Sequence, residues 1–302
     1  IVFPSRFFTG NDAMERMFYP GGFQGNGVIG ASQELVNSFG MANGRPITDP
    51  LSGYDATKPY LNREPRFYSA IFYNGENTYK KNDNTKPVMY KFENWANGGK
   101  DAAGATQNNS RTNYHIKKFV YMGTNWADAS IDRQPHSKFF IEWSHMVLTF
   151  AEAANHVTHN PNNALYGLSP KAAIKYLRSR KTYDGATATF NTTDPYLDAT
   201  ATAGETAFDS LVKNERRIET CFEGMRFYDL RRWTTDADWQ SIINQPVHGA
   251  AITRNPDNTT FTYNLNFEVE PRSFQSPYLP IPYNEMLRMS NLIQNEGWEN
   301  WN

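Results

Sequence analysis

The strongest structural signal in this sequence is a helical repeat of apolar residues between positions 139 and 157. The apolar side chains recur at steps of three and four and would share one helix face: Phe140, Trp143, Val147, Phe150, Ala151 and Ala154. Ser169 and Pro170 provide the cap and first residue of a second helix, with Ala173, Ile174 and Leu177 facing inward. Two helices with a short connection predict a helical hairpin.

A single helical hairpin cannot bury its own apolar face. In tetratricopeptide-like arrays, neighbouring hairpins stack and cover one another. This chain starts with Ile1-Val2-Phe3, which lacks an initiator methionine and reads like the inside of a strand. We therefore expect an N-terminal part of the protein to precede this chain, and the hairpin at residues 139–180 to pack on helices of that part.

Other segments carry shorter or less regular signals. A short helix is expected after Ser32, with Gly40 near its end, and residues 67–72 are expected to form a short helix or a strand after a turn at Pro65. A single long helix is expected from Glu205 toward Leu230, with these residues on its buried side: Phe208, Leu211, Val212, Ile218, Phe222 and Met225. Cys221 lies in that helix and is expected to be a buried small residue.

The rest of the chain has the composition of long loops. Residues 1–30, 76–135 and those after Asn244 show little helical or strand period, apart from a short strand expected in the last segment. Loops of such length in a compact domain are usually functional or disordered. We expect one mainly α domain over residues 1–302, divided into a loop-rich binding region (1–135), a helical region (136–233) and a C-terminal loop segment (234–302).

Two segments resemble the signature sequences of the SusD/RagB family. Residues 214–233, NERRIETCFEGMRFYDLRRW, are similar to its signature helix, and residues 279–298, LPIPYNEMLRMSNLIQNEGW, are similar to its C-terminal segment, with Trp298 where a tyrosine is usual. Weaker resemblance is carried by residues 32–36, 62–67 and 150–153, with Glu64 where the family commonly has aspartate. The matches follow the family's order and leave residues 76–135 and 234–275 outside.

This resemblance implies a nutrient-binding lipoprotein on the outer face of the Bacteroidetes outer membrane. Family members are mainly α, with tetratricopeptide-like hairpins and a loop-rich half that holds the ligand. They cover a SusC-like TonB-dependent transporter and pass it glycans or, in some members, peptides. The lipid anchor would belong to the N-terminal part that this chain lacks, and no cofactor is implied.

Carboxylates in the signature helix raise the alternative of a surface glycoside hydrolase. Glu215, Glu219 and Glu223 stand at i, i+4 and i+8, so they would project from one face, whereas glycosidases place two carboxylates on opposite sides of a bond. Nearby guanidinium groups would keep them ionised: Arg216, Arg217, Arg226, Arg231 and Arg232. Glu142 and Glu152 would lie about 15 Å apart along their helix. We expect an ion network and no catalytic residue.

The sequence gives little evidence for a metal site or for binding to nucleic acid. His156 and His159 stand at i, i+3, but no third ligand follows at a recognisable spacing, so we expect no metal site. The formal net charge of −1 gives no field that would attract a polyanion.

Aromatic residues in the loops are the candidates for ligand binding. Rings stack on the apolar faces of sugars or peptide side chains, and neighbouring amides bind hydroxyl groups. The candidate residues lie in the first loop and in the long insertion: Phe8, Tyr19, Phe23, Gln24, Asn94, Trp95, Asn125 and Trp126. We expect glycan rather than peptide as the ligand. A structural subunit without a ligand of its own remains a further alternative.

Overall fold

The computed structural model describes residues 3–4, 12–23, 25–82, 86–104, 109–121, 139–179 and 193–299. The chain divides into two compact units, which are taken in turn: unit 1 comprises Ile1–Glu219 and His248–Phe267, and unit 2 comprises Thr220–Val247 and Glu268–Asn302. The three regions expected from the sequence do not coincide with these units, and the single domain stays a prediction.

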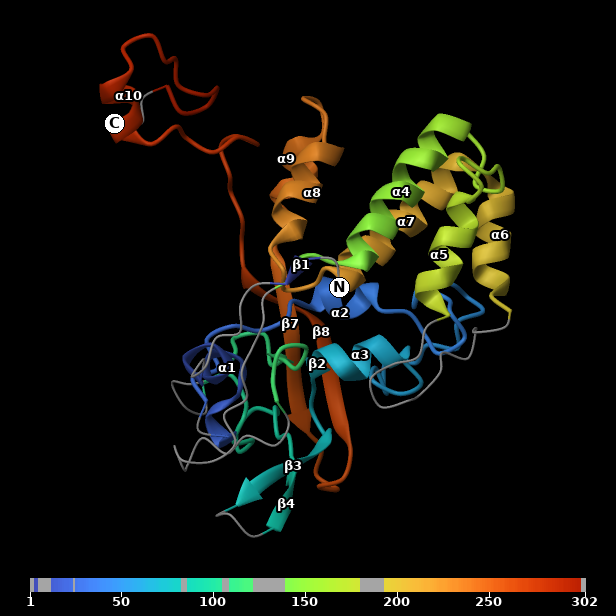
Figure 1. Ribbon diagram of the computed structural model, residues 1–302. Coiled ribbons are helices and arrows are strands. Elements are labelled where there is room, and N and C mark those ends of the chain that lie inside the picture. Colours follow the sequence, from blue (N-terminus) through green and yellow to red (C-terminus); the bar gives the residue numbers. More distant parts are fainter. Residues whose placement is uncertain are drawn as a thin grey trace. The chain divides into compact units, whose positions relative to one another are not determined.

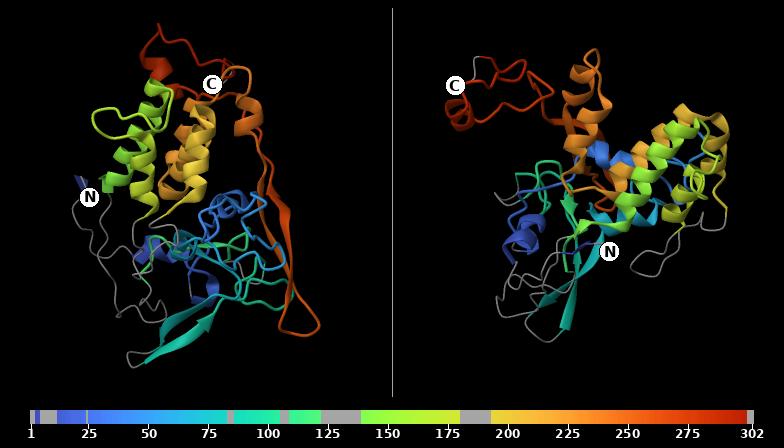
Figure 2. Two further views of the ribbon diagram at one scale, coloured as in Figure 1. Left: turned by 90° about the vertical axis from the view of Figure 1, so that its right-hand side faces the viewer. Right: turned by 45° about the horizontal axis from the view of Figure 1, so that its top comes forward.

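Four helices lie side by side in unit 1 (Figures 1 and 2). They are α4 (Trp143–Thr158), α5 (Pro170–Arg178), α6 (Pro195–Ala203) and α7 (Glu205–Glu219). The predicted hairpin is confirmed as α4 and α5. The Ser169 hydroxyl accepts a hydrogen bond from the Ala172 backbone N–H at 3.2 Å, which is the predicted N-cap.

The apolar core of these helices corrects one expectation. Side chains from all four helices form one buried cluster, which includes Leu148, Ile174, Leu197, Phe208 and Val212. The side chains in this cluster that come from α4 and α5 are therefore covered by α6 and α7, and for them the expectation of cover by helices outside this chain was wrong; Trp143, also on the predicted apolar face, is 54% exposed. Helix α6 was not predicted, because its sequence PYLDATATA has too few large apolar residues to show a helical period.

The long helix expected from Glu205 toward Leu230 is interrupted. Helix α7 ends at Glu219, and α8 (Met225–Trp233) begins after a turn over residues 220–224. Phe222 has φ +67° and Gly224 has φ +79°, both in the left-handed region that ends right-handed helices. Cys221 lies in this turn and is buried, as expected.

The first part of unit 1 consists of short elements. Helix α1 is Asp12–Phe18, a 3₁₀ turn is Gly21–Phe23, and α2 is Gln33–Ser38, capped by Ser32 as predicted. Both alternatives for residues 67–72 occur in succession, because α3 (Pro65–Ala70) leads into β2 (Ile71–Phe72). Strand β2 pairs with β5 (His115–Ile116), and β1 (Phe3–Pro4) pairs with β6 (Phe139–Ile141), both antiparallel.

Two longer β-hairpins occupy segments that were expected to be mostly loop. Strands β3 (Asn77–Asn82) and β4 (Lys86–Lys91) pair antiparallel, and β7 (Val247–Arg254) pairs with β8 (Phe261–Glu270), seen as the long orange hairpin in Figure 1. In β8 large apolar residues alternate with polar ones, FTYNLNFEVE, which is a strand signal; a short strand was expected after Asn244, and β8 is a longer one, paired with β7. The turn before β8 is held by Asp257, whose Oδ1 accepts the N–H groups of Thr259 and Thr260 at 2.8 Å.

Unit 2 consists of α8, α9 (Trp239–Ile243), α10 (Tyr283–Arg288) and extended segments. Pro280 and Pro282 flank Ile281 and favour the extended chain that leads into α10. Among the described helices of both units, none is both long and apolar enough to cross a membrane.

Candidate functional site

Four of the predicted ligand-binding residues, Phe8, Gln24, Asn125 and Trp126, lie outside the described residues. The other four, Tyr19, Phe23, Asn94 and Trp95, all belong to unit 1. All four are buried. Their surroundings determine what each can contribute to a ligand site.

Tyr19 and Phe23 belong to a buried cluster of rings. The Tyr19 and Phe23 ring centroids are 5.1 Å apart, and Phe23 stacks on Phe92 at 5.4 Å, which in turn stacks on Phe72 at 4.5 Å. The Tyr19 hydroxyl donates a hydrogen bond to the Tyr121 carbonyl oxygen at 2.8 Å. These rings pack the first loop against the residues around Phe72 and Phe92 in unit 1. Their faces are therefore buried and not open to a ligand in this arrangement.

The close packing of this cluster explains why residue 22 of the first loop is a glycine. A Cβ atom at Gly22 would lie 1.8 Å from the Tyr90 hydroxyl and 2.5 Å from Asp101 Oδ1. That hydroxyl donates a hydrogen bond to Asp101 at 2.7 Å. A side chain at Gly22 would therefore disrupt a buried hydrogen bond, so the glycine is required by the close approach of the two segments.

Asn94 and Trp95 lie at the start of the segment that follows β4. The Asn94 backbone N–H donates to Asn74 Oδ1 at 3.0 Å, and its side-chain amide donates to the Asn113 carbonyl oxygen at 2.9 Å, so Asn94 holds three loop segments together. Trp95 is 8% exposed. Its ring lies 5.3 Å from that of Phe261, and the Arg254 guanidinium carbon is 5.2 Å from its centroid. Trp95 thus packs on the β7–β8 hairpin.

The predicted ion network is present on α7. Arg66 on α3 lies 2.7 Å from Glu64, 2.8 Å from Glu215 and 2.7 Å from Glu219. Arg178 on α5 forms ion pairs with Asp194 at 2.6 Å and with Glu215 at 2.5 Å. Arginines of the signature helix were expected as partners; Arg66 and Arg178, which come from distant positions, were not predicted.

This network controls the ionisation of its carboxylates. Burial alone would raise the pKa of Glu215, but the charges of Arg66 and Arg178 outweigh it and hold that pKa below its usual range. The same attraction raises the pKa of Arg178 despite its burial. Glu215 is thus ionised and fully engaged by two guanidinium groups, an environment that suits a structural ion pair and not a general acid.

At the other end of the signature sequence, Asp229 lies 2.9 Å from Arg232. Asp229 is buried and Arg232 is largely exposed. This pair belongs to unit 2 and holds the last turn of α8.

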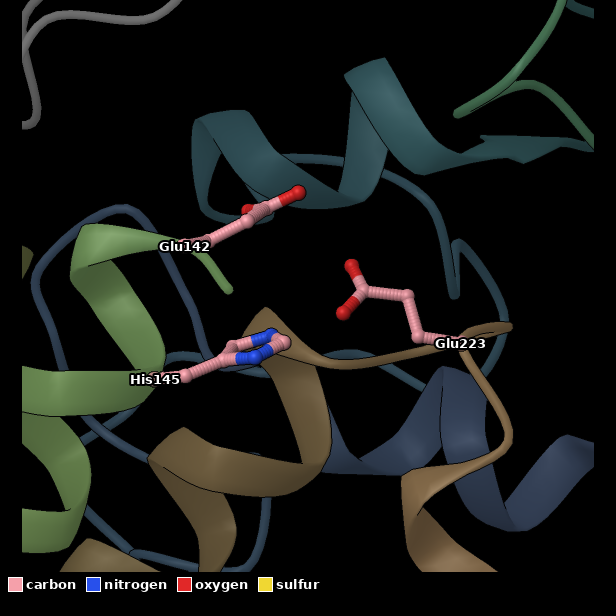
Figure 3. Close-up of side chains that lie close together, drawn as sticks. All are labelled: Glu142, His145 and Glu223. Carbon is pink, nitrogen blue, oxygen red and sulfur yellow. The ribbon is translucent and has the colours of Figure 1, made fainter. Parts of the chain in front are cut away.

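A glutamate and a histidine, Glu142 and His145, lie three positions apart at the start of α4 in unit 1 (Figure 3). Glu142 is the N-cap residue of α4, and its carbonyl oxygen accepts the His145 backbone N–H at 3.1 Å. Glu223, the third residue labelled in Figure 3, belongs to unit 2. Glu152 lies ten residues further along α4 and is buried, so Glu142 and Glu152 do not form a carboxylate pair.

His156 and His159 at the end of α4 each have a carboxylate partner. Their Nδ1 atoms lie 3.1 and 2.8 Å from the Glu205 carboxylate at the start of α7, and His156 Nε2 lies 3.2 Å from Asp209. The hydrogen bonds from His159 and His156 lower the pKa of Glu205. These partners were not predicted from the sequence, because they follow 46 or more positions later.

A cavity of about 500 Å³ lies beside the ion network in unit 1. Its walls come from α2, from the loop that follows it, from α6 and from α7, and they include Glu34, Asn37, Met41, Tyr196 and Asn214. Glu64, Arg178 and Glu215 also line it; Arg178 and Glu215 form an ion pair with each other, and Glu64 pairs with Arg66. No sequence signal pointed to this cavity, because its lining residues come from five separate segments.

Comparison with known proteins identifies the family of this chain from its sequence and its fold from solved structures. The sequence profile described as the SusD family matches residues 4–298. No curated protein matches the sequence.

Two solved structures from Bacteroides fragilis resemble the chain over most of its length. A SusD-like protein has 23% identity and a TM-score of 0.66 over 98% of this chain and 54% of its own. A protein described as a SusD-like carbohydrate binding protein has 18% identity and a TM-score of 0.61 over 89% of this chain and 50% of its own. At this identity the likeness shows the fold, which is SusD-like. The chain spans about half the length of these solved relatives.

Proposed function

Because this chain belongs to the SusD family, we propose that it is part of a cell-surface protein that captures glycans and delivers them to a TonB-dependent outer-membrane transporter. The observation that carries this proposal is the family match over residues 4–298. A solved structural relative described as a carbohydrate binding protein supports glycan as the ligand class. Peptide is the alternative ligand.

The cellular setting is proposed on the same family grounds. We place the protein on the outer face of the outer membrane, held by a lipid anchor in an N-terminal part and working with a SusC-like transporter. The α4–α5 and α6–α7 pairs serve as tetratricopeptide-like hairpins in a mainly α body. Their shared apolar cluster makes them a rigid support for the loops.

The ligand is proposed to be bound without being cleaved. A retaining or inverting glycosidase needs two carboxyl groups facing each other across a bond, one of them able to hold a proton. Glu215 and Glu219 instead share the guanidinium group of Arg66 at 2.8 and 2.7 Å. This pairing supports a binder over a surface glycoside hydrolase.

We propose that aromatic and amide side chains of the loop-rich part contact the glycan. Trp126 with Asn125, and Phe8 with Gln24, retain the role predicted from the sequence. Trp95, which is 8% exposed, is proposed to contribute mainly by holding the loop against Phe261 and Arg254. Tyr19, Phe23 and Asn94 are proposed to act indirectly, since their packing and hydrogen bonds hold the loops that carry the other residues.

Binding to a panel of oligosaccharides and peptides tests this function. Isothermal titration of the wild type and of Trp126→Ala distinguishes glycan binding from peptide binding. Tyr166→Ala is the matched aromatic control, because Tyr166 is exposed. We expect binding to one glycan class, at least tenfold weaker binding by Trp126→Ala, equal to about 1.4 kcal/mol, and unchanged binding by Tyr166→Ala.

The alternatives predict other results. Binding to peptides only would replace glycan by peptide as the ligand. Binding to neither panel by a folded protein would favour a structural subunit of a surface complex. Unchanged affinity of Trp126→Ala would reject the proposed loop site while leaving the function in place.

A further inference from the structure

Unit 2 contains its own cavity, of about 350 Å³. One wall is α8 with the turn that follows it, the other is the extended segment at residues 277–279, and Asn295 completes the lining. All of its lining residues belong to unit 2, and none of them is among the loop residues proposed to bind the ligand.

Hydrogen bonds fix the two walls of this cavity. Arg231 on α8 donates from Nε to the Pro277 carbonyl oxygen at 2.8 Å and from Nη1 to the Phe227 carbonyl oxygen at 3.0 Å. Its guanidinium carbon lies 3.5 Å from the centroid of the Phe227 ring. Arg231 thus ties the helix wall to the extended wall.

The extended wall is also held by the C-terminal segment. Trp298 Nε1 donates to the Tyr278 carbonyl oxygen at 2.9 Å, and the Asn295 side-chain amide donates to the Leu279 carbonyl oxygen at 2.7 Å. These contacts use the C-terminal segment to fix the backbone of the wall, so the positions of the side chains that it carries are preorganised.

Two exposed tyrosines give the cavity its aromatic surface. Tyr228 on α8 is 66% exposed and Tyr278 on the extended wall is 54% exposed, although both line the cavity. The Phe227 ring packs edge-on against Tyr228 at 5.2 Å. Large rings left exposed at a cavity are available to stack on a ligand with an apolar face.

The polar groups of the lining define the ligand class. Thr234, Thr235, Asp236 and Asn295 present hydroxyl, carboxylate and amide groups, and Arg231 supplies one positive charge opposite the single negative charge of Asp236. This balance disfavours a strongly anionic or cationic ligand. Rings combined with hydroxyl-binding groups and no net charge match the alternating apolar faces and hydroxyls of a neutral sugar.

We propose that this cavity is a second glycan site, which binds a neutral sugar ring between Tyr228 and Tyr278. The inference rests on the proposed glycan-binding function and adds a site to it. The Asp236 carboxylate accepts hydrogen bonds from sugar hydroxyls, and the Thr235 hydroxyl accepts or donates them. The Thr234 hydroxyl, which donates to the Arg231 carbonyl oxygen at 2.9 Å, accepts them, while the tyrosine rings cover the apolar face. Sites of this kind add to the affinity for a polymer that can occupy more than one of them.

Titration of the intact chain with neutral hexasaccharides tests the second site. The probes are malto-, cello-, xylo- and mannohexaose, and the variants are the double substitution Tyr228→Ala/Tyr278→Ala, its conservative counterpart Tyr228→Phe/Tyr278→Phe, and Trp126→Ala. Tyr283→Ala is the matched control, because Tyr283 is 47% exposed in the same unit and does not line the cavity.

We expect the double alanine variant to bind at least about tenfold more weakly, or to lose one binding event. The double phenylalanine variant, which keeps both rings, and Tyr283→Ala should remain within about twofold of wild type. Circular dichroism should show the same helix content in all variants.

Two results would overturn the second site. If wild type binds a hexasaccharide and the double alanine variant binds it equally well, the cavity is not a glycan site, while the proposed function stands. If wild type binds no neutral glycan, the second site and the glycan function fail together.

Discussion

Arg66 on α3 and Glu215 on α7 form an ion pair of 2.8 Å between residues that are 149 positions apart. Both side chains are largely or fully buried. The pair joins the first part of unit 1 to its helical part and lies at the centre of the network formed with Glu64, Glu219 and Arg178. The conspicuous charges of the signature helix thus have a structural role in unit 1.

Replacing Arg66 by alanine should strongly destabilise unit 1. The substitution leaves three buried carboxylates with one fewer cation, and breaking a buried ion pair on one side costs about 3–5 kcal/mol. Urea unfolding followed by circular dichroism measures the change in the free energy of unfolding. Arg66→Lys should restore little of it, because an ammonium group cannot bridge three carboxylates in the geometry of a guanidinium group.

The control for Arg66 is Arg45, which pairs with Asp49 at 2.6 Å nearer the surface. Arg45→Ala should lower the free energy of unfolding by less than about 1 kcal/mol. If Arg66→Ala were no more destabilising than Arg45→Ala, the network would not have this structural role.

Phe208→Ala tests the burial of the α4–α5 face by α6 and α7. Phe208 is fully buried in the cluster shared by the four helices, and its truncation should cost about 3–5 kcal/mol of unfolding free energy. The control is Tyr176→Ala on α5, whose side chain is 60% exposed and whose loss should cost less than about 1 kcal/mol. Equal effects, measured by thermal unfolding, would show that α7 does not cover the hairpin.

Gly224→Ala distinguishes the interrupted helix from a continuous one. Gly224 has φ +79°, and no atom lies within 4 Å of the position that an added Cβ would occupy, so alanine should cost about 1–2 kcal/mol through backbone strain alone. In a continuous helix the same substitution would stabilise by about 1 kcal/mol. The sign of the change in the free energy of unfolding, measured in urea, therefore decides between the two.

His115 should make the protein sensitive to mild acid. It is fully buried on β5, and burial lowers its pKa from 6.5 to about 4. Between these values the unfolded chain binds the additional proton, so the free energy of unfolding falls as the pH is lowered. From pH 7 to pH 5 this group should remove about 2 kcal/mol.

His115→Leu should lack this part of the acid sensitivity, as measured by urea unfolding at pH 7 and pH 5. Burial raises the pKa of Glu76 to about 7, so protonation of Glu76 acts in the opposite direction, but it is common to both proteins and cancels in the comparison. Identical pH dependence of the two proteins would contradict a neutral buried His115.

Local signals allowed several elements to be predicted from the sequence. The caps Ser32 and Ser169 and the apolar period of residues 139–157 depend on neighbours within a few positions, and α2, α4 and α5 formed as expected. The break before α8 was missed because the apolar period continues through Phe222 and Met225, although Gly224 gave a signal for a helix end.

Features that depend on distant contacts could not be predicted in the same way. Phe23 was chosen as a ligand residue because it is aromatic and lies in a glycine-rich loop, and nothing nearby in sequence indicates its stacking on Phe92. Arg178 was not recognised as a partner of Glu215, because the two residues lie on separate helices that only the fold brings together. The two cavities likewise combine residues from segments that only the fold brings together.

The central claim, capture of glycan without cleavage, is tested most directly by measuring binding and turnover on the same sample. Purified protein is titrated with each glycan that it retains and is then incubated with an excess of that glycan while released reducing ends are counted. We predict saturable binding and no reducing ends above the protein-free control. Reducing ends that increase with protein concentration, and persist through repurification, would contradict the account.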